Sequence, residues 1–199
     1  MRFGRIFALY DDTMQAAPGV LTNERLTALN GALLLVLLAA IGVTVLRPRQ
    51  MLPEHYLLGF LLVPPVGLKL ATTGYRFIRY YTGDAAYRAA GPPPLFLRLI
   101  GPVVVVSTVV VFGTGIELWL FGFRFGAWWR PAHLLSFVVW LFAMLFHVTM
   151  HVERSWEAVV QRGPIAARSV VIGSLVLGVA LAAASLTYAT PFGGAVEAR

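Results

Sequence analysis

Cysteine is missing from this sequence of 199 residues. Without it the chain can form no disulfide, no thiolate–metal bond and no iron–sulfur cluster, and it cannot attach haem covalently through a C-x-x-C-H motif. A metal would have to be bound through nitrogen or oxygen atoms. The chain has four histidines, and they are the first candidates for a functional site: His55, His133, His147 and His151.

Charged residues are also scarce. They make up 13% of the chain, whereas hydrophobic residues make up 58% and the mean hydropathy is +0.76. A soluble domain carries about 25% charged residues. Such a deficit is typical of a chain whose surface faces lipid, and it predicts an integral membrane protein.

Five apolar runs interrupt the polar segments, at about 26–46, 53–76, 99–121, 131–152 and 170–188. Each is long enough to cross a hydrocarbon core about 30 Å thick, which takes roughly 20 helical residues. None alternates in the manner of a barrel strand. We therefore expect an all-α membrane bundle, with a cytoplasmic N-terminal segment (1–25) and a four-helix transmembrane core of two hairpins (26–152). Residues 153–199 would supply a cytoplasmic loop, a fifth transmembrane helix and an outer tail.

The basic residues indicate how the helices are oriented. Of 16 basic residues 15 are arginines; ten of these precede the first run or lie in the second and fourth connections, and five lie on the opposite side. The positive-inside rule predicts a multi-pass protein of the cell membrane with a cytoplasmic N-terminus and an outer C-terminus. Short, dispersed basic segments of this kind do not form a phosphate-binding face, so we expect no nucleic-acid partner.

The two predicted hairpins resemble one another at the point where each second helix begins. Pro53 is followed two residues later by His55, and Pro131 by His133. Proline is tolerated in the first turn of a helix, where its missing N–H leaves no hydrogen bond unmade. The second helices of the hairpins should therefore run parallel, each with a histidine at the same depth near the outer face.

His55 and His133 are placed to ligate one haem b. Haem iron accepts an axial nitrogen on each side, so two parallel helices must present imidazoles at one depth. Gly59 lies one turn below His55 and would leave room for the flat ring. The alternative is that both histidines are interfacial side chains at helix starts and bind no cofactor. Arginines at the same edge are candidate propionate partners: Arg47, Arg49, Arg124 and Arg130.

A second site is predicted deeper in the bundle. His147 and His151 fall within about 40° of His133 around one helix, and His147 lies about 21 Å further along the axis at 1.5 Å per residue. The matching position in the first hairpin is Lys69, which would have to lose its proton to ligate iron. The inner group therefore admits a second haem, a quinone-contacting or proton-carrying cluster with Lys69 and Tyr75, or hydrogen bonding within the bundle.

Three motifs stand out within residues 26–152: Glu54-His55-x3-Gly59, Tyr75-Arg76-Phe77-x2-Arg79-Tyr80-Tyr81, and His133-x2-Ser136-Phe137-x2-Trp140 followed by His147-x3-His151. Through these motifs the chain resembles the small membrane cytochrome b proteins, the group that includes cytochrome b561-type and formate-dehydrogenase gamma-type anchor subunits. The resemblance implies that His55 and His133 ligate haem b and that the subunit passes electrons between the quinone pool and a redox partner. Lys69 departs from the pattern, because it leaves the usual second ligand pair incomplete.

These observations favour an electron-transfer subunit without substrate chemistry of its own. Its partner by analogy would be an outer-face oxidoreductase, with a molybdenum enzyme as the candidate. Two haem-free alternatives remain open. One is an anchor or assembly subunit in which the histidines only connect helices. The other is a small transporter, although the first, third and fifth apolar runs offer few polar residues to line a path.

Overall fold

The structure is a computed structural model that describes residues 18–92, 95–152, 156, 160 and 165–192. Five long helices run along the molecule, and each is long and apolar enough to cross a membrane. They are α2 (Pro18–Val45), α3 (Leu52–Tyr81), α5 (Leu95–Phe121), α6 (Trp129–Thr149) and α8 (Ile165–Ser185), with a short α4 (Ala85–Ala89) between α3 and α5. The described residues include no strand. The predicted all-α membrane bundle is confirmed.

The first helix begins at Pro18, well before the predicted start near residue 26. Its early turns contain polar residues, which ended the apolar run in the sequence. These residues bind the neighbouring helix α3: the Asn23 side-chain amide donates to the Thr72 carbonyl oxygen at 3.2 Å, and Glu24 pairs with Arg76 at 2.9 Å. Contacts across the hairpin therefore satisfy polar groups that a lone membrane helix would leave unpaired. Residues 1–17 of the predicted N-terminal segment lie outside the described residues.

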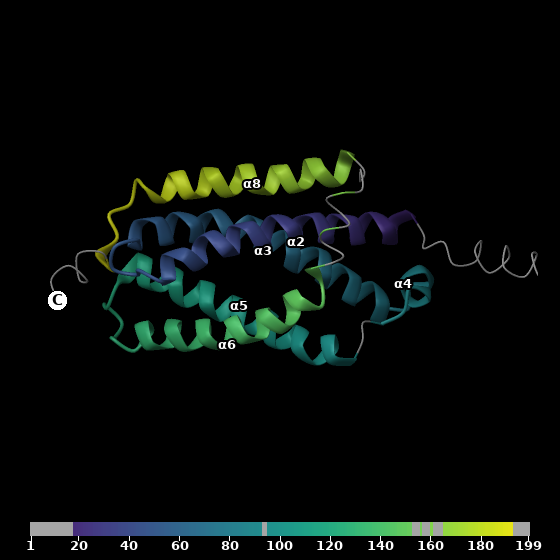
Figure 1. The fold of residues 1–199 in the computed structure, drawn as a ribbon, viewed down its shortest axis with the longest axis horizontal. Coiled ribbons are helices and arrows are strands. Elements are labelled where there is room, and N and C mark those ends of the chain that lie inside the picture. The colour runs from purple at the N-terminus through teal and green to yellow at the C-terminus, as the bar shows by residue number, and fades with distance from the viewer. Residues whose placement is uncertain (1–17, 93–94, 153–155, 157–159, 161–164, 193–199) are drawn as a thin grey trace, which may run out of the picture.

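The helices form two packed units (Figure 1). Helices α2, α3 and α8 pack together, and α5 packs along α6, while contacts between the two units are sparse. The α2–α3 and α5–α6 connections lie at the same end of the bundle, which we call the loop end; α4 lies at the opposite end. Helices α3 and α6 both begin at the loop end and run parallel, as the hairpin pattern predicts. The fifth membrane helix is not peripheral, because it packs closely against α3.

Two prolines inside α3 explain this close packing. Pro65 has no N–H, so the carbonyl oxygen of Leu61 has no hydrogen-bond partner within its own helix. Gly178 of α8 lies directly against that oxygen, where a Cβ atom would collide with it. On the other side of α3, the side-chain amide of Asn30 donates to the Pro65 carbonyl oxygen at 2.8 Å. The stretch of α3 from Leu61 to Pro65 is thus contacted through its backbone by both α8 and α2.

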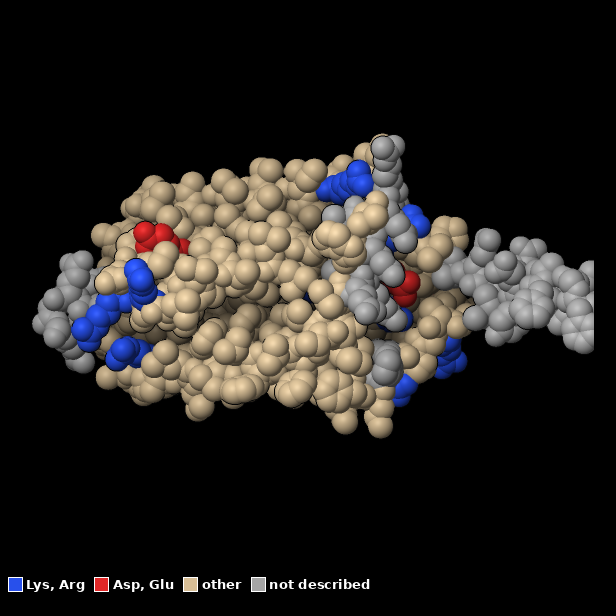
Figure 2. All heavy atoms as spheres, viewed as in Figure 1, with Lys and Arg blue, Asp and Glu red and all other residues tan. Residues whose placement is uncertain are grey.

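Charged side chains gather at the two ends of the molecule (Figure 2). In this view lysine and arginine side chains lie at either end, and the surface between them carries neutral residues. Many large apolar side chains of the long helices are exposed, among them Val106, Leu135 and Leu181. A broad apolar band between two charged ends is the surface that a bilayer covers. The protein is therefore a multi-pass membrane protein in contact with lipid.

Candidate functional site

The structure brings His55 and His133 together at the seam between the two units. His55 lies in the first turn of α3 and His133 in the first turns of α6, so their parallel helices present both imidazoles near the loop end. The ring centroids are 6.4 Å apart and the ring planes are perpendicular. Both side chains are partly buried. The predicted pair of histidines at one depth is thus a feature of the fold.

The hydroxyl of Thr44, at the end of α2, fixes the protonation of the His55 ring. Thr44 Oγ1 lies 2.6 Å from the carbonyl oxygen of Ile41 and 2.8 Å from Nδ1 of His55. A hydroxyl has one proton, and here it is donated to the carbonyl oxygen, which can only accept. The contact with His55 therefore requires a proton on Nδ1, and Nε2 is left with a free lone pair.

Thr114 of α5 does the same for His133. Its hydroxyl donates to the Val110 carbonyl oxygen at 2.7 Å and lies 3.0 Å from Nδ1 of His133. By the same count of protons, Nδ1 of His133 carries hydrogen. Both histidines thus present Nδ1 to a threonine hydroxyl, which would leave Nε2 as the atom for a bond to a metal.

The donor set suits a metal that brings further ligands with it. For a metal–nitrogen bond of about 2 Å, two imidazoles on opposite sides of one ion have centroids roughly 6 Å apart, close to the observed 6.4 Å. The described residues contain no group of three or more histidine, aspartate or glutamate side chains that could hold an ion alone. A haem would bring four nitrogens of its own and would need only two imidazoles from the chain. The two histidines fit haem b in number and spacing.

Two glycines lie near this pair, the predicted Gly59 and Gly115 of α5. A Cβ atom at Gly115 would come within 3.1 Å of Cε1 of His133, so the ring would have to shift by a few tenths of an ångström to admit a side chain there. A Cβ atom at Gly59, one turn from His55, would meet nothing within 4 Å. The space beside Gly59 lies on the α3 surface. A macrocycle between the two histidines would occupy the seam, where the packing between units is light.

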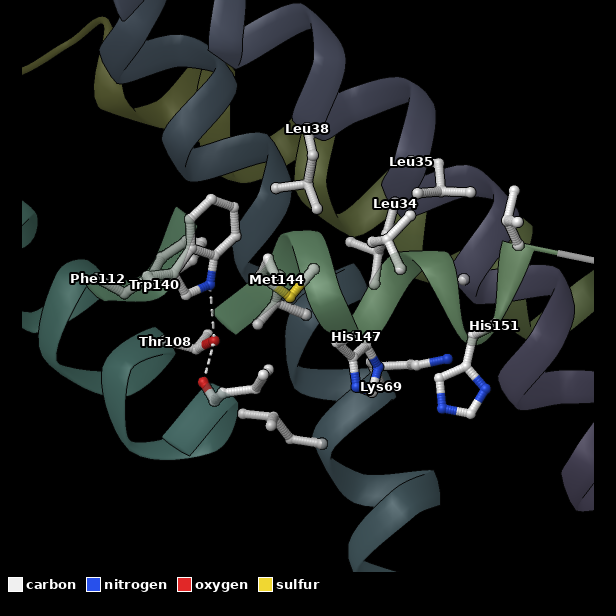
Figure 3. A pocket seen from close by; sticks show the side chains of 16 residues that line it. Leu34, Leu35, Leu38, Lys69, Thr108, Phe112, Trp140, Met144, His147 and His151 are labelled. Atoms are coloured by element: carbon white, nitrogen blue, oxygen red, sulfur yellow. Dashed lines mark hydrogen bonds between the residues drawn. The ribbon is translucent and has the colours of Figure 1, made fainter. Parts of the chain in front are cut away.

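The inner histidines form a separate group further along the seam (Figure 3). The rings of His147 and His151 have centroids 4.6 Å apart, and both line a hollow between the units together with Lys69. Most of the other walls are apolar, contributed by α2, α3, α5 and α6. They include Leu34, Leu35, Leu38, Phe112, Trp140 and Met144. This hollow does not reach His55 or His133, so the chain has two distinct candidate sites.

Lys69 and His147 differ in their hydrogen bonds. The ammonium of Lys69 donates to the carbonyl oxygen of Thr27 at 2.8 Å, across the α2–α3 hairpin. Nδ1 of His147, in contrast, is buried and has no hydrogen-bond partner among the described residues. Tyr75, the other predicted member of the group, is half exposed and contacts Tyr87 instead. It does not line the hollow.

Sequence reasoning did not assign a role to Thr44 or Thr114. A partial signal for both was present, because each threonine lies near the end of the first helix of a hairpin and each histidine near the start of the second helix. Their distances from the loops differ, so spacing alone does not pair them. A further contact crosses the α5–α6 hairpin, where the Trp140 indole N–H donates to the Thr108 hydroxyl at 3.0 Å (Figure 3).

Comparison of the chain with protein-family models, with curated proteins and with solved structures gives no match.

Proposed function

We propose that this protein is a membrane-embedded b-type cytochrome subunit that carries electrons between the quinone pool and a redox partner. His55 and His133 would be the two axial ligands of one haem b near the outer face. The observation that carries this proposal is the state of the two rings. Their centroids are 6.4 Å apart, and Nδ1 of each contacts a threonine hydroxyl, which would leave Nε2 to bind the iron.

Haem held by His55 and His133 would supply a one-electron carrier, which suits electron transfer. The chain's own residues would bind it and set its surroundings. The two histidines are partly buried between the helices of the two units. Exposed arginines at the loop end are available to pair with the carboxylates of the macrocycle: Arg47, Arg49, Arg124 and Arg130.

The inner hollow supports the quinone part of the proposal. A quinone has a flat polar head and an apolar tail, and the hollow combines apolar walls with two imidazoles. Nδ1 of His147 has no hydrogen-bond partner among the described residues. It would form a hydrogen bond with a quinone oxygen. A second haem has less support here, because the Lys69 nitrogen that would have to face the iron is bound to Thr27. We therefore propose one haem per chain and a quinone at the inner site.

The arginines support one direction of the subunit in the membrane. In the sequence, five of the 15 arginines belong to the first and third connections or the C-terminal segment, and ten belong to the N-terminal segment or the other connections. By the positive-inside rule, the loop end with His55 and His133 would lie on the outer side of the cell membrane. The redox partner would dock there; by the resemblance to cytochrome b anchors, an outer-face molybdenum oxidoreductase is the candidate.

Four histidine variants test the proposal and separate it from a haem-free anchor or a transporter. His55→Ala and His133→Ala should each abolish the low-spin haem b spectrum of protein purified from haem-replete cells. His147→Ala and His151→Ala are matched controls, because they remove partly buried imidazoles from the same bundle, and they should keep the spectrum. Loss of the haem in His147→Ala with retention in His55→Ala would show that the ligands are assigned to the wrong site.

A further inference from the structure

We infer that Thr44 and Thr114 are a matched pair of positioning residues that hold the two haem-ligating histidines in the ligating tautomer and set the reduction potential of the iron. The inference rests on the proposed function, since it assigns residues that act on the haem through His55 and His133. It concerns a relationship that both hairpins share. In each, a threonine of the first helix is bonded to Nδ1 of the histidine that begins the second helix.

The first step concerns burial: both threonines lie where water cannot take over the role of their hydroxyls. Thr44 is 1% exposed and Thr114 is 5% exposed. Each donates its proton to its own helix, to Ile41 or Val110, and presents a lone pair to an imidazole N–H. If the hydroxyl were removed, Nδ1–H would be a buried donor without this acceptor, and the cost of an unmade bond of this kind is about 1–3 kcal/mol.

The second step concerns the tautomer. A neutral imidazole in water carries its proton on either nitrogen, and only the Nδ1–H form offers Nε2 to a metal. A fixed acceptor at Nδ1 favours that form and also fixes the angle of the ring about its Cβ–Cγ bond. The perpendicular arrangement of the two rings is then set by the positions of two threonines on two different helices.

The third step concerns electron density. An acceptor at Nδ1–H makes the imidazole a stronger donor through Nε2, and a stronger donor stabilises ferric over ferrous iron. Loss of either hydroxyl should therefore raise the reduction potential. If the ferric form loses ten times more affinity than the ferrous form, the midpoint rises by about 59 mV. Serine keeps the hydroxyl and should keep the potential.

The experiment compares Thr44→Val and Thr114→Val with Thr44→Ser and Thr114→Ser in the purified full chain. Valine has nearly the shape of threonine but no acceptor. We expect each valine variant to bind haem 10–100-fold more weakly and to have a raised midpoint potential, and each serine variant to match the wild type. Thr72→Val is the control, because Thr72 is also buried and bonded to its own helix but contacts neither histidine.

The outcomes separate the inference from the proposed function. Haem in the wild type with unchanged affinity and potential in both valine variants would overturn the inference alone. So would equal defects in the valine and serine variants, which would indicate packing rather than hydrogen bonding. Absence of haem from the wild type would overturn the proposed function itself.

The wild-type protein supplies a second measurement that does not depend on the folding of any variant. The Nδ1–H protons of both ligands should appear in the proton NMR spectrum of the ferric protein as shifted signals that exchange slowly with deuterium. Slow exchange of both signals supports the inference. Rapid exchange of both would show that no buried hydroxyl holds these protons, and would overturn it.

Discussion

The imidazole rings of His55 and His133 are perpendicular, with their centroids 6.4 Å apart. When two axial ligand planes are perpendicular, their π-donation to two of the iron d orbitals is equal and these orbitals are nearly degenerate. Ferric iron between them should then give a highly anisotropic low-spin EPR signal with a large maximum g value. A rhombic signal, which accompanies nearly parallel planes, would contradict this arrangement. The measurement uses the oxidised wild-type protein at liquid-helium temperature.

Gly115 sets the space available to the His133 ring. Alanine at this position would place Cβ 3.1 Å from Cε1 of the ring, and overpacking of this kind costs about 1–3 kcal/mol. We therefore expect Gly115→Ala to weaken haem binding roughly tenfold, since 1.4 kcal/mol corresponds to that factor. Titration of the apoprotein with haem measures the change.

Gly113→Ala is the matched control for this substitution. Gly113 lies on the same helix, and a Cβ atom there would meet nothing within 4 Å. Alanine is favoured over glycine within a helix by about 1 kcal/mol at both positions. A difference in haem affinity between the two variants therefore reports the contact with the ring. Equal haem affinity in the two variants would show that Gly115 does not shape the site.

Met144 tests the inner hollow as the quinone site. Met144 lines the hollow, whereas its neighbour Leu145 is 58% exposed on the lipid-facing side. Met144→Trp should fill the hollow and slow reduction of the haem by a quinol in liposomes by roughly tenfold, with the haem spectrum unchanged. Leu145→Trp adds the same side chain on the outside and should not slow it. A similar rate in both variants would place the quinone elsewhere.

Gly178 tests the packing of the fifth membrane helix. A side chain there would collide with the backbone carbonyl of Leu61, which cannot move aside as a flexible side chain could. Gly178→Ala should therefore lower the free energy of unfolding in detergent by about 1–3 kcal/mol. Gly173→Ala on the same helix meets nothing within 4 Å and should leave it unchanged or higher. Equal stability of the two variants would contradict the close approach of α8 to α3.

The helices and the histidine pair could be predicted from the sequence for physical reasons. Apolar runs long enough to cross a bilayer leave few alternatives to membrane helices, and the repeated Pro-x-His places His55 and His133 at equivalent positions. The start of α2 could not be predicted from hydropathy, since Asn23 and Glu24 are polar and are stabilised only by α3.

The roles of other residues depend on contacts between helices, which periodicity does not reveal. Lys69 falls at the position expected for a second ligand, but its partner is a backbone oxygen of Thr27. The place of α8 depends on a single carbonyl freed by Pro65 and on the absence of a side chain at Gly178. Both features appear only when the helices are placed in space.

The central claim is that His55 and His133 together hold one haem b. Its most direct test is the absorption spectrum of the wild-type protein purified from haem-replete cells, with the haem then extracted into alkaline pyridine and quantified against protein. The account predicts a red protein with the reduced-minus-oxidised bands of low-spin haem b and one haem b per chain. A colourless, folded protein from which pyridine extracts no haem would contradict it.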